Sequence, residues 1–188
     1  STVNMLGCHD GIPLLDLKGL LPEEEIQSLI DRIVSRGGMV KNLHGQKNLY
    51  YQVNATYYSA LGESDEKMLL ARAIQMFMPG KPQIWYLDLF AGKNDHEAVQ
   101  RAGESGHKEI NRTNLSTDQI TEGLKKDVVQ KQLALIRMRN THKAFSEGAE
   151  VAISGGERTL EIRWEYNSAF ATLYVNFESG TYTIVESR

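Results

Sequence analysis

The stretch Met5-Leu6-Gly7-Cys8-His9-Asp10-Gly11-Ile12-Pro13 begins as a short apolar segment and breaks at a charged pair beside a glycine. This pattern predicts a strand that ends at His9-Asp10, and in parallel α/β folds the functional side chains lie where strands end. A carboxylate can stabilise a developing positive charge, and an imidazole can bind a sugar hydroxyl. The same residues are also typical of an ordinary turn, in which Asp10 accepts backbone N–H bonds and Gly11 takes a positive φ.

Composition limits the classes of protein to which the chain can belong. Its 188 residues, 41% of them hydrophobic, suffice for one core, or for one core with a small satellite. The formal net charge is −3, and no block of like charge indicates a nucleic-acid or membrane surface. No apolar run approaches the roughly 20 residues of a membrane span. The single cysteine, Cys8, excludes an internal disulfide and favours a reducing compartment, so we expect a cytoplasmic protein.

The order of predicted elements is strand, helix, strand, helix, followed by a small β module. Apolar residues at helical spacing and capping signals predict helices over 22–36 and 64–78, from residue 116, and over 127–143. A strand is predicted over 81–87, and alternating residues after Gly148 predict about four antiparallel strands. Two parallel strands alone leave exposed sheet edges. We therefore expect a missing N-terminal portion or self-association, as in a fragment of a longer protein.

Two polar segments are candidates for sugar binding. Residues 39–56 are predicted to be irregular, and their aromatic and carboxamide groups can stack on sugar rings and bind hydroxyls. An equally good interpretation is a surface loop with Tyr50 or Tyr51 folded back on the core. Arg112 is a natural bidentate donor, although a loop arginine is usually solvated. We expect Trp164 and Tyr174 to be core residues of the β module rather than sugar platforms.

Four motifs, in order along the chain, together resemble one family. They are Cys8-His9-Asp10-Gly11-Ile12, Tyr51-Gln52-Val53-Asn54-Ala55-Thr56-Tyr57-Tyr58-Ser59-Ala60-Leu61-Gly62, Ala91-Gly92-Lys93-Asn94-Asp95 and Glu109-Ile110-Asn111-Arg112. The sequence resembles the C-terminal part of the sucrose phosphorylases, which belong to the α-amylase superfamily. The resemblance implies the last two β/α units of a (β/α)8 TIM barrel over residues 1–145, followed by a small antiparallel β domain over 146–188.

The resemblance also implies roles for individual residues. Asp10 matches the transition-state stabiliser of the family, and His9 matches a residue that binds glucose hydroxyls. Tyr51 with its neighbour Tyr50 matches the part of the acceptor loop that admits phosphate, and Gln52 matches a residue that meets the acceptor sugar. Arg112 matches an arginine that contacts the donor glucose.

The implied reaction is a retaining phosphorolysis of a small-molecule α-glucoside, which needs inorganic phosphate as co-substrate and no metal or organic cofactor. An Asp attacks the anomeric carbon, a Glu protonates the leaving sugar, and phosphate attacks the glucosyl-enzyme. In the family, both of these carboxylates lie on earlier barrel strands. We therefore expect this chain alone to be inactive; if it were active, the nucleophile would have to be a carboxylate such as Asp10, Asp88 or Asp95.

Three departures from the family pattern lie where the acceptor would bind. They are Pro13, Leu49 and the segment Thr113-Asn114-Leu115. Fructose is therefore in question as the acceptor, and a phosphorylated fructose, glycerol or glycerate is an alternative. Two other classes of function stay open: a hydrolase or transglucosidase of the amylase superfamily, and a non-catalytic carbohydrate-binding module.

Overall fold

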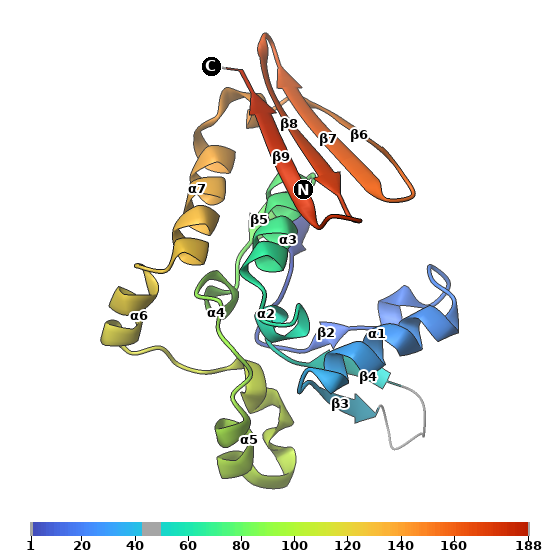
Figure 1. The fold of residues 1–188 in the computed structure, drawn as a ribbon, viewed down its shortest axis with the longest axis vertical. Coiled ribbons are helices and arrows are strands. Elements are labelled where there is room, and N and C mark those ends of the chain that lie inside the picture. Colours follow the sequence, from blue (N-terminus) through green and yellow to red (C-terminus); the bar gives the residue numbers. More distant parts are fainter. Residues whose placement is uncertain (1, 43–49, 188) are drawn as a thin grey trace. The chain divides into compact units, whose positions relative to one another are not determined.

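The computed structural model describes residues 2–42 and 50–187, apart from a few side chains within those ranges. The chain divides into two compact units (Figure 1). One comprises Ser1–Leu6, Asp65–Gln83 and Lys125–Arg188, and the other comprises Gly7–Ser64 and Ile84–Leu124. Each unit therefore combines segments that are distant in sequence, and the domain boundary expected at residue 145 stays a prediction.

A parallel pair of strands opens the first unit. β1 (Val3–Met5) pairs with β5 (Lys81–Gln83), and α3 (Asp65–Phe77) and α7 (Asp127–Thr141) belong to the same unit. Gln75 of α3 ties the two strands together, because its Nε2 donates to the carbonyls of Asn4 at 3.2 Å and Gln83 at 2.9 Å. Both helices form where the sequence predicts them. The strand predicted over 81–87 is too long, since the chain enters α4 (Tyr86–Leu89) instead.

The same unit contains a four-stranded antiparallel sheet, as the sequence predicts. After η4 (Lys143–Phe145), the strands β6 (Glu150–Gly156), β7 (Thr159–Tyr166), β8 (Ala169–Asn176) and β9 (Thr181–Glu186) pair in sequence order. Trp164 is a core residue, and its Nε1 donates to the carbonyl of Phe77 at 2.6 Å. The expectation that Tyr174 is buried is wrong: it is 44% exposed, because strand alternation turns it to the face opposite Leu173 and Val175.

The prediction that residues 39–56 are irregular is wrong where they form two strands of a second sheet. β2 (Ile12–Pro13), β4 (Tyr50–Asn54) and β3 (Met39–Asn42) form an antiparallel sheet in the order β2-β4-β3. η1 (Leu15–Leu17) and α1 (Glu23–Ser35) complete the hydrophobic cluster beside it. The buried members of that cluster are Leu14, Ile26, Ile30 and Val53. The polar residues Gln52 and Asn54 are buried in β4 and bond to each other, which polar composition does not reveal.

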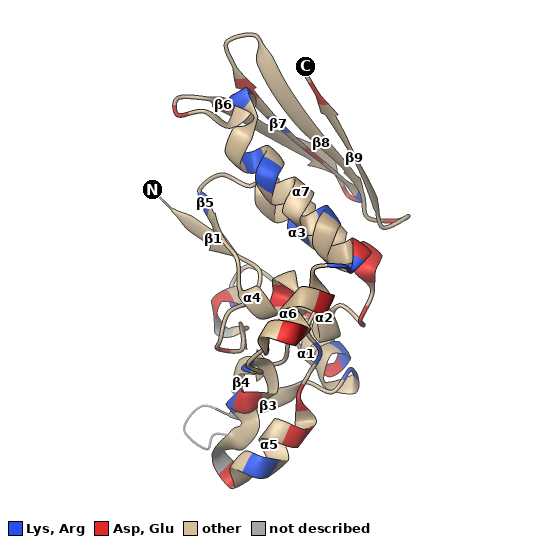
Figure 2. Cartoon of the chain, turned by 90° about the vertical axis from the view of Figure 1, so that its left-hand side faces the viewer, with Lys and Arg blue, Asp and Glu red and all other residues tan. Residues whose placement is uncertain are grey.

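The rest of the second unit is made of short helices. These are α2 (Tyr57–Ala60), α4, α5 (His96–Ala102), η3 (Gly103–Asn111) and α6 (Thr117–Gly123). The capping box predicted at Ser116 is present, with Gln119 as its reciprocal partner. Acidic and basic residues are interspersed along helices such as α5 (Figure 2). Within the described ranges, every helix is too short or too polar to cross a membrane.

Candidate active site

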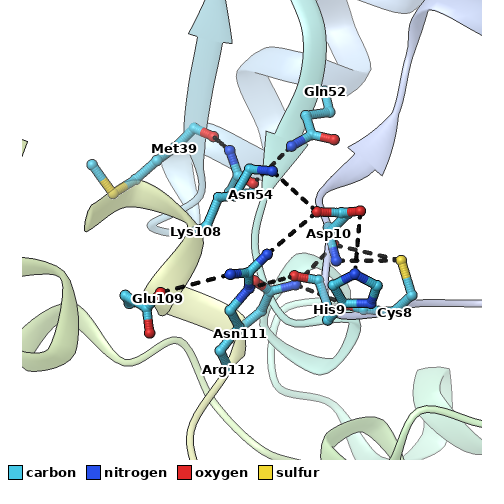
Figure 3. A network of polar contacts seen from close by, with 10 residues as sticks. All are labelled: Cys8, His9, Asp10, Met39, Gln52, Asn54, Lys108, Glu109, Asn111 and Arg112. Carbon is cyan, nitrogen blue, oxygen red and sulfur yellow. Dashed lines mark hydrogen bonds and ion pairs between the residues drawn. The ribbon is translucent and has the colours of Figure 1, made fainter. Parts of the chain in front are cut away.

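The turn Cys8–Asp10 follows β1 and is held through its main chain by two neighbouring residues. Asn111 Nδ2 donates to the carbonyl oxygens of Cys8 at 2.9 Å and Asp10 at 2.8 Å. Arg112 Nε donates to the carbonyl oxygen of His9 at 2.9 Å (Figure 3). Three consecutive carbonyls are therefore bonded by a segment that lies about a hundred residues later in the sequence.

Three nitrogen-bearing side chains surround the carboxylate of Asp10 (Figure 3). Lys108 Nζ lies 3.2 Å and Arg112 Nη2 lies 3.4 Å from Oδ1, while His9 Nε2 lies 3.5 Å from Oδ2. Partial burial by itself raises the pKa of Asp10. The hydrogen bond and charge of Lys108, with contributions from His9 and Arg112, outweigh burial and hold that pKa below its usual value. Asp10 is therefore a fixed negative charge at neutral pH, suited to stabilising positive charge.

The turn continues into a close contact with β4. A Cβ on Gly11 would meet the carbonyl oxygen of Val53 at 2.7 Å and Cδ of Gln52 at 3.0 Å. Gly11 does not adopt a positive φ, so close approach of β4, and not turn conformation, explains the glycine. Gln52 is buried against the turn, and its Nε2 donates to Asn54 Oδ1 at 3.1 Å. The predicted acceptor residue and the predicted transition-state stabiliser thus lie on adjoining segments.

The residues predicted from the sequence are therefore brought together in part. His9, Asp10 and Arg112 contact one another, and Gln52 lies beside the same turn. The backbone of Tyr50 and Tyr51 belongs to β4, but their side chains lie outside the described residues. The catalytic and binding roles of these residues stay predictions.

The structure also places three residues at the site that the sequence did not single out. Lys108 contacts Asp10, Asn111 holds the turn, and the ring of Trp85 lies 6.1 Å from that of His9. Asn111 carried a signal, since it precedes Arg112 within one of the four motifs. Lys108 lies in a segment of mixed polar residues, and Trp85 lies in the apolar run after β5, so neither had a distinctive pattern.

A chain of hydrogen bonds links the four motifs to one another. Asn94 Oδ1 accepts from the backbone N–H of Thr56 at 2.7 Å, and the N–H of Asp95 donates to the carbonyl of Ile110 at 2.9 Å. Asp95 also caps α5 by accepting from the N–H of Ala98 at 2.8 Å. That bond is the main cause that lowers the pKa of Asp95. The Asp95 carboxylate therefore serves a helix cap, which argues against a nucleophilic role.

No cluster of histidine, cysteine, aspartate and glutamate able to hold a metal ion occurs among the residues that the structure describes. The prediction that the reaction needs no cofactor stays a prediction. The polar groups gathered around Asp10 are suited to binding sugar hydroxyls, and the Asp10 carboxylate itself is suited to facing an oxocarbenium-like centre.

Comparisons with known proteins identify relatives of the chain. No family model matches the chain. It is 54% identical to a sucrose 6(F)-phosphate phosphorylase of Ilumatobacter coccineus, over 98% of this chain and 37% of that protein. It is 37% identical to a sucrose phosphorylase of Agrobacterium vitis, over 100% of this chain and 40% of that protein. The crystal structure of the sucrose 6F-phosphate phosphorylase from Thermoanaerobacter thermosaccharolyticum matches with a TM-score of 0.92 and 38% identity, over 99% of this chain and 39% of that one.

These comparisons confirm the resemblance and the fold class. The chain spans well under half the length of the relatives it matches and corresponds to a C-terminal part of them. Its fold is the last two β/α units of a (β/α)8 barrel followed by a small antiparallel β domain.

Proposed function

We propose that this chain, a member of the sucrose phosphorylase family by sequence and fold, works as the C-terminal part of a retaining glucoside phosphorylase. The observation that carries the proposal is the Asp10 carboxylate, which is bonded by Lys108 and Arg112, is ionised at neutral pH and lies in the turn that follows β1 in the sequence. A carboxylate held in this way stabilises the positive charge that develops on the anomeric carbon.

The reaction proceeds by two displacements at the anomeric carbon. An aspartate attacks that carbon while a glutamic acid protonates the leaving sugar; inorganic phosphate then attacks the glucosyl ester and gives α-glucose 1-phosphate. In this proposal, both of these carboxylates lie outside the 188 residues of this chain. The reaction uses no metal or organic cofactor, and the single Cys8 suits a reducing, cytoplasmic setting.

Each site residue has a role in this scheme. Asp10 stabilises the transition state, and His9 and Arg112 bind the hydroxyls of the donor glucose. Gln52 meets the acceptor sugar from β4, and Tyr51 with Tyr50 helps to admit phosphate. The close approach of β4 to Gly11 supports this assignment, because Gln52 and Asp10 then lie on adjoining segments.

We propose sucrose 6F-phosphate as the substrate and fructose 6-phosphate as the released sugar. The supporting observation is the higher identity to a sucrose 6(F)-phosphate phosphorylase, 54%, than to a sucrose phosphorylase, 37%. The departures from the family pattern at Pro13, at Leu49 and at Thr113-Asn114-Leu115 agree with an acceptor other than fructose, although Leu49 lies outside the described residues. A hydrolase, a transglucosidase and a non-catalytic sugar-binding module are less favoured, because the relatives are phosphorylases.

The test is phosphate-dependent release of α-glucose 1-phosphate from sucrose 6F-phosphate and from sucrose. It is run on this chain and on a longer polypeptide that carries it, with Asp10→Asn as the control. We expect release only from the longer polypeptide, faster with the phosphorylated substrate, and none from the control. Release by this chain alone would refute the assignment of the nucleophile to another segment. Glucose production independent of phosphate would indicate a hydrolase.

A further inference from the structure

Asn111 makes its two hydrogen bonds to one short segment of main chain. Its side-chain nitrogen donates to the carbonyls of Cys8 and Asp10, at 2.9 and 2.8 Å, so a single amide group spans the turn on both sides of His9. Asn111 is only 2% exposed. Its Oδ1 is buried and has no hydrogen-bond partner among the described residues. Asn111 therefore acts on the turn through its two N–H donors.

The backbone of Asn111 is itself firmly anchored. The preceding residue, Ile110, is fully buried, and its carbonyl accepts from the N–H of Asp95 at 2.9 Å. The next residue, Arg112, bonds both the carbonyl of His9 and the carboxylate of Asp10. A buried side chain on an anchored backbone has few alternative positions, so a main-chain segment bonded to it is held in place as well.

We propose that Asn111 is a positioning residue that fixes the main chain of the Cys8–Asp10 turn and thereby the position of the Asp10 carboxylate. Arg112 and Lys108 contact the carboxylate itself, whereas Asn111 reaches it only through the backbone. The catalytic consequence rests on the proposed function, but the effect on the turn does not. A catalytic group displaced by a fraction of an ångström to an ångström loses much of its contribution to the rate.

The experiment replaces Asn111 in the longer polypeptide that carries this chain. Asn111→Asp keeps the size of the side chain and removes both donors, and Asn111→Ala removes them without adding charge. Asn140→Asp and Asn140→Ala are the matched controls, because Asn140 is an exposed residue of α7, in the other compact unit. Three quantities are measured: kcat and KM with sucrose 6F-phosphate and phosphate, amide hydrogen exchange by peptide, and the rate of Cys8 alkylation by iodoacetamide.

Cys8 reports on the turn without any reference to activity. Its Sγ is half-buried and accepts from the backbone N–H of Asp10 at 3.3 Å, so an opened turn exposes it. Loss of two hydrogen bonds raises the fraction of molecules in which the Cys8–Asp10 turn is open. We therefore expect Cys8 to be alkylated about tenfold faster in both Asn111 variants. Faster hydrogen exchange should be confined to peptides around residues 7–12. We expect kcat to fall about 100-fold, with KM for phosphate nearly unchanged.

Several outcomes would overturn the proposal. They are unchanged Cys8 alkylation in both Asn111 variants, hydrogen exchange that rises equally throughout the protein, and equal effects in the Asn140 controls. If kcat stays within about threefold of the wild type in both Asn111 variants, the catalytic part is refuted. If the wild type shows no phosphorolysis but the Asn111 variants still open the turn, the proposed function fails and the positioning role stands.

Discussion

Replacing Asp10 by Asn removes one negative charge and leaves the size of the side chain almost unchanged. If Asp10 stabilises the transition state, kcat for phosphorolysis should fall by about 10²- to 10³-fold, the loss typical of one preorganised electrostatic group. KM for phosphate should change little, because Asp10 faces the donor sugar in the proposed scheme. The effect on stability follows from the two cations at Oδ1, Lys108 and Arg112.

The distances set the size of that effect. Lys108 Nζ and Arg112 Nη2 lie 3.2 and 3.4 Å from the same oxygen, so they are at most about 6.6 Å apart, the sum of those distances. Without the carboxylate they repel each other by at least about 0.6 kcal/mol at the dielectric constant of water. The side chains are partly exposed, so each lost ion pair costs only about 0.2–1 kcal/mol. We therefore expect Asp10→Asn to lower the free energy of unfolding by about 1–2.5 kcal/mol.

A double-mutant cycle separates stability from activity. Lys108→Met removes one of the two cations, so in the Asp10→Asn background it should cost less stability than it does alone. The expected coupling is about 0.5–1 kcal/mol, measured by urea denaturation of the wild type, both single variants and the double variant. The double variant should stay as inactive as Asp10→Asn. Additive stability effects would show that the ion pair does not form, and nearly normal kcat in Asp10→Asn would refute the catalytic role.

Three further predictions concern the surrounding structure. Asp95→Ala removes the cap of α5 and should cost about 1 kcal/mol at neutral pH. The pKa of Asp95 is lowered in the folded state, chiefly by the N–H of Ala98. The stability difference between the wild type and Asp95→Ala should therefore be fully present above the unfolded-state pKa of about 3.9 and shrink as the pH falls below it. Urea titrations at pH 7 and pH 3 would test this. Gly7→Ala would push a Cβ into the Asp88 carboxylate and should destabilise the protein by about 1–3 kcal/mol in chemical denaturation. Trp164→Phe would leave a carbonyl at the end of α3 without its buried donor, and a loss of about 1–3 kcal/mol should appear in thermal unfolding; no loss would contradict the bond.

Local patterns predicted the elements that follow a simple rule. The helix over Asp65–Phe77 has capping signals and an apolar face, and the strands after Gly148 alternate cleanly, so both were predicted correctly. The segment Ile84–Leu87 is short and apolar, and such a run does not distinguish a strand from a helical turn. β4 was missed for the opposite reason: Gln52 and Asn54 satisfy each other in the interior, so a buried strand has the composition of a loop.

The site residues likewise fall into those that a local pattern predicts and those that only the fold brings together. Asp10 and His9 were found because a charged pair at the end of a predicted strand is a local pattern with a chemical meaning. Lys108 and Asn111 act on that pair from about a hundred residues away, and no local pattern distinguishes a lysine that bonds a carboxylate from a solvated one. Their contribution depends on the fold, which brings the end of η3 beside the turn. The sequence could thus identify the carboxylate that does the proposed chemistry. The residues that position this carboxylate and lower its pKa became visible only in three dimensions.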